Sequence, residues 1–150
     1  MGTVSNDIKH RLKDIKDRNF FITEDENLLK SLSSEDIKVE YLSRTMIRLE
    51  DDSVDVLVGA RFLKESIEVL KIELVYSFEV VDLNDVVKVD ETLKKIDFPK
   101  SLLCTFLSVS MGSLRGVLYE RVKGTELVNY FLPLVDMDVL LGINMFVVKK

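Results

Sequence analysis

Residues 67–81 read IEVLKIELVYSFEVV, and this stretch decides the fold. Apolar side chains recur at every second position from residue 70 to residue 80, with Lys, Glu and Ser at most of the positions between them. Successive side chains of a strand point to opposite faces of a sheet. The alternation therefore predicts one long strand with a buried face and a solvated face.

The segments before this strand have the same period. Residues 37–49 and 54–62 alternate apolar and polar side chains, and polar turns at 50–53 and 64–66 separate the three segments. Strands joined by short polar turns pair as antiparallel neighbours, and such a sheet can keep one face wet. We expect an antiparallel sheet whose apolar face needs a cover.

A long helix over residues 100–123 is the predicted cover. Pro99 stands where a helix begins, and Gly124 is a natural C-terminal cap. Between them Leu103, Phe106 and Leu107 open a broad apolar stripe. The expected fold class is α+β, with the antiparallel sheet packed against this helix.

The opposite side of this helix is small and almost uncharged. A helix that contacts only its own sheet normally shows Lys and Glu there, so one interpretation is contact with a second subunit. An alternative of equal weight is that two N-terminal helices cover this face. The candidate interface residues are Ser101, Cys104, Thr105, Ser108, Gly112 and Arg115.

Shorter elements are expected on either side. Ile8, Leu12 and Ile15 predict a helix from Asn6, and Thr23 opens a second short helix. Helical turns are expected near 85–87 and 91–96, an extended segment after 125, and a last helical turn at 137–141. We expect one domain over 1–150, with a helical N-terminal segment (1–34) and a sheet and helix core (35–150).

Composition excludes several functions. The 150 residues carry a net charge of -5 and their basic residues are scattered, so nucleic acid is not an expected partner. The N-terminus lacks the apolar core of a secretory signal, and no uncharged apolar stretch approaches the roughly 20 residues of a membrane span. The expected location is the cytoplasm, without membrane insertion.

No motif for catalysis, metal or cofactor binding emerges. The single histidine, His10, has no second ligand at metal spacing, and Cys104 reads as an inert thiol within the long helix. The glycines lack a phosphate-loop pattern. An enzyme would need a carboxylate pair drawn from Glu73, Glu79 and Asp82, which the spacing does not favour. We expect no catalytic residues, no metal and no cofactor.

The second half resembles the SecB family of protein-export chaperones, and in particular its uncharacterised SecB-like branch. The likeness rests on strand 72–81, the helix after Pro99 with Arg115-Gly116 near its end, and Gly124-Thr125 followed by the run FLPLVD at 131–136. It implies a four-stranded antiparallel sheet, dimer and tetramer contacts through the long helix, and grooves that hold unfolded clients. The C-terminus lacks the family's acidic tail, which puts coupling to the SecA motor in doubt.

The leading functional hypothesis is therefore a chaperone-like protein that holds extended apolar segments of other polypeptides. Apolar burial gains about 25 cal/mol per Å² without requiring one client sequence. The alternative is a structural or regulatory subunit whose apolar surfaces serve self-assembly or one dedicated partner. The candidate client-binding residues are Leu57 and Leu63, taken as an exposed sheet edge, with Phe131, Leu132, Leu134 and Val135.

Overall fold

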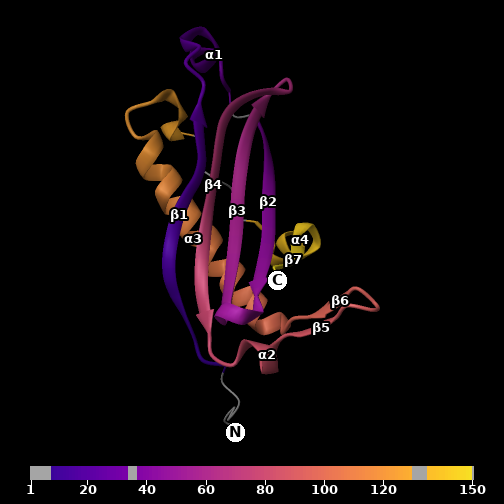
Figure 1. Cartoon of the computed structure of the whole chain (residues 1–150). Coiled ribbons are helices and arrows are strands. Elements are labelled where there is room, and N and C mark those ends of the chain that lie inside the picture. The colour runs from indigo at the N-terminus through magenta and orange to yellow at the C-terminus, as the bar shows by residue number, and fades with distance from the viewer. Residues whose placement is uncertain (1–7, 34–36, 130–134, 150) are drawn as a thin grey trace, which may run out of the picture.

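The computed structural model describes residues 8–33, 37–129 and 135–149. Its elements are β1 (His10–Ile22), α1 (Glu26–Lys30), β2 (Ile37–Arg48), η1 (Leu49–Asp51), β3 (Ser53–Lys64), β4 (Ile67–Val80), α2 (Leu83–Val86), β5 (Lys88–Asp90), β6 (Lys95–Asp97), α3 (Lys100–Val122), η2 (Glu126–Asn129), α4 (Met137–Ile143) and β7 (Met145–Lys149). Figure 1 shows a long twisted sheet crossed on one face by α3.

The main sheet has five strands in the order β1-β4-β3-β2-β7. All of its pairs are antiparallel except β2 with β7, which is parallel. The strands β5 and β6 form a separate hairpin, which projects from the lower end of the molecule in Figure 1. The α+β class with a largely antiparallel sheet and a long helix is confirmed, and the sheet has one strand more than expected.

The hairpin of β3 and β4 supplies the centre of the core. Val56 lies opposite Tyr76 and Val58 opposite Leu74, and all four side chains are buried. These residues hold the alternate positions that the sequence pattern assigned to the buried face. We call this face the covered face, because α3 packs on it, and the other the open face.

The helix α3 covers the sheet as predicted. It begins directly after Pro99, and Gly124 just beyond its end has a φ of +80°, a conformation that glycine adopts without strain. The ring of Phe106 stacks on Phe78 of β4, with ring centroids 4.0 Å apart. By length and composition α3 could also cross a membrane, but its apolar stripe lies against the covered face.

The predicted N-terminal helix is wrong, because residues 10–22 form the edge strand β1 paired with β4. The register shifts twice, between Leu12 and Asp14 and between Asp17 and Asn19. Each bulge adds one residue, so positions on the covered side follow one another in alternating steps of two and three. The three-residue step from Leu12 to Ile15 imitates the spacing of a helix.

Other departures lie outside the main antiparallel sheet. The expected helical turn at 91–96 is replaced by the β5–β6 hairpin, and the segment after Thr125 is the 3₁₀ helix η2 rather than extended chain. Residues 130–134 lie outside the described part. The predicted turn at 85–87 corresponds to α2, and α1 and α4 are confirmed. Their N-caps are Asp25, in place of the expected Thr23, and Asp136.

The unexpected fifth strand is tied to β2 by a polar contact on the covered face. The hydroxyls of Ser43 and Thr45 both donate to Oδ1 of Asn144, at 2.8 and 2.9 Å. Asn144 immediately precedes β7, and Phe146 within β7 packs against Phe98. The chain after α4 therefore returns to the sheet and pairs with β2 along Arg44–Arg48.

The Phe78–Phe106 stack makes a direct stability prediction. Phe106 is fully buried, so Phe106→Ala should lower the free energy of unfolding by about 3–5 kcal/mol through lost transfer energy and a cavity. Urea titration followed by circular dichroism measures this. Leu93→Ala, at a side chain that is 62% exposed, is the control and should change stability by less than about 0.5 kcal/mol. Equal effects of the two substitutions would contradict the assigned core.

Candidate functional site

The strand β1 is the most exposed element of the sheet. It ends the strand order, and in the described part of the chain no strand pairs with its outer side. Four of its apolar side chains are largely in solvent: Leu12 (40% exposed), Ile15 (47%), Phe20 (39%) and Phe21 (43%). A long, apolar edge with unpaired N–H and C=O groups is a template for pairing with another chain.

Contacts with α3 hold β1 in place along the sheet. The guanidinium of Arg121 donates to Asp17 and lies 4.9 Å from the ring centroid of Phe20. At the other end of β1, the ring of His10 meets the edge of Phe106. The strand is therefore anchored on its inner side, and its outer edge faces solvent.

Sequence reasoning missed this edge. The four apolar residues of β1 were assigned to a helix or left unassigned, because two bulges conceal the strand period. One signal was available, since Phe20, Phe21 and Ile22 are aromatic and β-branched residues, which are enriched in strands.

The predicted client-binding residues are dispersed. Leu57 and Leu63 lie on β3, the middle strand of five, and are only 5% and 8% exposed. The expected sheet edge at these residues is therefore wrong, because β2 and β4 pair on both sides of β3. Val135 is half-buried against the core. Phe131, Leu132 and Leu134 lie outside the described residues.

The small-residue side of α3 is uncovered. Of the six candidate interface residues, Ser101, Thr105, Ser108 and Gly112 are exposed, whereas Cys104 and Arg115 are half-buried. The alternative cover, two N-terminal helices, is overturned because β1 occupies that part of the chain. A Cβ atom added at Gly112 or Gly116 would meet nothing within 4 Å. This side of the helix is open to close approach.

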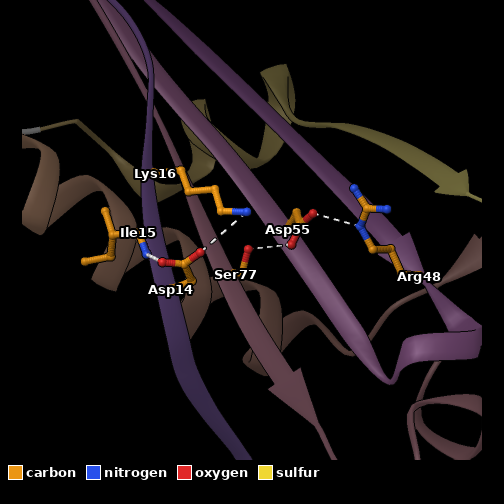
Figure 2. Close-up of polar contacts among 6 residues, drawn as sticks. All are labelled: Asp14, Ile15, Lys16, Arg48, Asp55 and Ser77. Atoms are coloured by element: carbon orange, nitrogen blue, oxygen red, sulfur yellow. Dashed lines mark hydrogen bonds and ion pairs between the residues drawn. The ribbon is translucent and has the colours of Figure 1, made fainter.

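The open face of the sheet carries a network of polar contacts. Asp55 of β3 accepts a hydrogen bond from Arg48 Nε at 2.8 Å and one from the Ser77 hydroxyl at 2.7 Å (Figure 2). On β1, the Asp14 carboxylate lies 3.6 Å from Lys16 Nζ and accepts from the backbone N–H of Ile15 (Figure 2). The open face is therefore solvated and charged, unlike the apolar covered face.

The titratable groups of the open face are arranged as ion pairs. The hydrogen bond from Arg61 holds the pKa of the Glu40 carboxyl below its usual value. Glu73 lies 3.9 Å from Arg18, and Glu79 pairs with Arg11. Within the described ranges, no group of three or more His, Cys, Asp or Glu side chains could hold a metal ion. The contact with Arg61 favours the charged form of Glu40.

Comparison with known proteins adds one structural likeness. No protein-family model matches the sequence, and the comparison with curated proteins found no match. Among solved structures, the chain is similar to the SecB-like chaperone Rv1957 of Mycobacterium tuberculosis in complex with a ChAD peptide from the HigA1 antitoxin. The identity is 11%, the coverage is 84% of this chain and 90% of that one, and the TM-score is 0.49. A likeness at this level decides neither family nor function.

The Asp55 network predicts a stability effect. Asp55→Ala should lower the free energy of unfolding by about 1–3 kcal/mol, because it leaves the half-buried Arg48 and the Ser77 hydroxyl without their acceptor. Urea titration measures the change. Glu24→Ala removes an exposed carboxylate and should stay within about 0.5 kcal/mol of the parent protein. A neutral Asp55→Ala would mean that the network adds nothing to stability.

Proposed function

We propose that this protein is a chaperone-like binder that holds extended segments of other polypeptides, without catalysing a reaction. The free edge of β1 is the observation that carries the proposal. An extended client can add to it as a further strand, with main-chain hydrogen bonds that do not depend on the client's sequence. The side chains of Leu12, Ile15 and Phe20 offer apolar contacts at the same edge.

The β1 edge is only partly protected. Natural sheets protect long edges with charges, prolines, bulges or a covering element. Between His10 and Ile22 the strand has charged side chains and two bulges but no proline, and four apolar side chains remain exposed among them. Covering such side chains gains about 25 cal/mol per Å². Broad specificity for apolar extended segments follows from this kind of contact.

We also infer that the protein forms a homo-oligomer through the small-residue side of α3. Glycine and serine side chains let two helices approach closely, and Gly112 and Gly116 have open space in front of them. The candidate interface residues on α3 remain a proposal, and so do Phe131, Leu132, Leu134 and Val135 as client-binding residues. A cytoplasmic location fits this role, and coupling to SecA is not part of the proposal.

The alternative function is a structural subunit in which the β1 edge meets only a second copy or one dedicated partner. The same exposed strand serves both roles, since an antiparallel pair of β1 strands would also complete the edge. The range of polypeptides that the protein binds distinguishes the two functions. A chaperone-like binder protects unrelated unfolded proteins, whereas a structural subunit does not.

The β1 edge can be tested by aggregation assays. The protein should suppress aggregation of a chemically unfolded test protein at near-stoichiometric ratios. The double substitution of Leu12→Ser with Ile15→Ser should weaken this suppression about tenfold, because about 1.5 kcal/mol or more of apolar contact is lost. Light scattering measures the change.

The control for this assay is Leu93→Ser, which removes a still more exposed apolar side chain from the turn between β5 and β6. It should suppress aggregation as well as the parent protein. Absence of suppression by the parent protein, together with a dimer through β1, would replace the chaperone-like role with the structural one.

Oligomerisation is tested by mass in solution. The parent protein should be larger than one chain, and Gly112→Leu should shift it toward the monomer because a bulky side chain separates the helices. Leucine favours a helix more than glycine does, so the protomer itself should remain folded. Gly142→Leu on α4 also meets open space and is the matched control. A monomeric parent protein, or an oligomer indifferent to Gly112→Leu, would contradict this interface.

A further inference from the structure

The open face of the sheet is hollowed between β1 and β2. A hollow of about 620 Å³ adjoins a smaller one of about 130 Å³, and Arg48 and Asp55 line both. We call the two together the open-face groove. Besides these two residues, its lining includes basic and acidic side chains and an apolar floor: Lys13, Asp14, Lys16, Arg18, Arg44, Met46, Asp51, Ser53, Leu57, Val75 and Ser77.

A row of facing residues crosses this groove. Lys16 of β1 lies opposite Val75 of β4, Val75 opposite Leu57 of β3, and Leu57 opposite Arg44 of β2. The row therefore has two apolar residues in its centre and a cation at each end. Neighbouring strands lie about 4.8 Å apart, so the two ends are about 14 Å apart along the sheet.

Positive charge exceeds negative charge in the groove. Its lining contains five basic residues and three acidic ones, although the whole chain has a net charge of -5. Of the acidic residues, Asp55 is already engaged by Arg48 and Ser77, and Asp14 lies beside Lys16. Arg18 lies 3.9 Å from Glu73, and no ion pair engages Lys13 or Arg44 among the described residues, so these two cations can attract an external anion.

Arg44 is the cation of the groove whose hydrogen-bonding capacity is least used. Among the described residues, no carboxylate forms an ion pair with it, and its Nε atom is buried without a hydrogen-bond partner. A half-buried guanidinium in this state is unfavourable, because a desolvated donor without a partner costs about 1–3 kcal/mol and more when charged. Arg18 and Arg48 line the same small hollow. An incoming carboxylate would meet three guanidinium groups there.

We propose that the open-face groove binds an acidic, extended polypeptide segment that lies across the strands. An apolar side chain of the segment covers Val75 and Leu57, and carboxylates on either side reach Lys16 and Arg44. In an extended chain, residues four positions apart are separated by about 13 Å, which matches the row. The recognised pattern is therefore an apolar residue with an acidic residue two positions before and two positions after it.

Charge complementarity and the apolar floor favour a polypeptide over a nucleic acid. A hollow of about 130 Å³ has room for a carboxylate, and the floor of Leu57 and Val75 fits an aliphatic side chain. A polyanionic backbone would also meet Asp14, Asp51 and the net negative charge of the chain. The groove is separate from the outer edge of β1. Peptide binding in the groove and client binding at the β1 edge can therefore be tested independently.

The test uses fluorescein-labelled peptides about nine residues long, the length of a strand of about 30 Å. One peptide has glutamates two positions before and after a central leucine, and its partner has glutamines there. Fluorescence anisotropy should show the glutamate peptide binding at least about tenfold more tightly. Arg44→Met should remove this difference, and Arg18→Met should reduce it. The charge-matched control Lys30→Met, on α1, should preserve it.

Several results would overturn the proposal. Equal affinity for the glutamate and glutamine peptides would show that the groove does not recognise charge. An Arg44→Met variant that still discriminates fully between the two peptides would show that Arg44 does not carry this recognition. If an oligouridylate binds as tightly as the glutamate peptide, and Arg44→Met abolishes that binding, the site recognises phosphate groups instead. The Leu12→Ser, Ile15→Ser protein should retain glutamate-peptide binding. A loss there would place the peptide at the β1 edge. Circular dichroism checks that each variant is folded.

Discussion

Contact between α3 and the covered face is the interaction on which the rest of the structure depends. The β3–β4 hairpin brings alternate apolar side chains to one side, and the stack of Phe106 on Phe78 fixes the helix against it. An isolated sheet with one apolar face is not stable in water, so the helix is a requirement rather than an addition. One helix covers one face only. The open face and the outer edge of β1 are left to solvent, and both proposed binding surfaces lie there (Figure 1).

The two surfaces differ in their physics. At the β1 edge the available interactions are main-chain hydrogen bonds and contacts with exposed apolar side chains, which discriminate weakly between sequences. In the open-face groove the interactions are charge-assisted, with guanidinium groups held by neighbouring strands at fixed positions. If both proposals hold, a broad surface beside a selective one on the same sheet would combine general holding of extended chains with preference for particular segments.

The exposed side of α3 has a different character from both. Most of its side chains are small, although Val109 and Tyr119 are also exposed there, and the open space at Gly112 and Gly116 favours close approach of another helix. Arg121, near the end of the same helix, instead contacts Asp17 and Phe20 on β1. The helix thereby positions β1 while a separate side of it is exposed. Oligomerisation through α3 would leave the open face accessible, since the two lie on opposite sides of the sheet.

The sequence alone determined the elements whose apolar period is regular: β2, β3, β4 and the helix after Pro99, together with the Asp136 cap of α4. In these elements the buried side chains recur at a constant interval, and the amino-acid sequence shows that interval directly. Tertiary structure decided the rest. The bulges of β1 replace a fixed period with steps of two and three, and the contacts that hold β7 beside β2, such as Asn144 with Ser43 and Thr45, join residues about a hundred positions apart. The groove, too, arises from registers between four strands. Such long-range pairings depend on loop closure and packing across the whole chain, which no local pattern of side chains encodes.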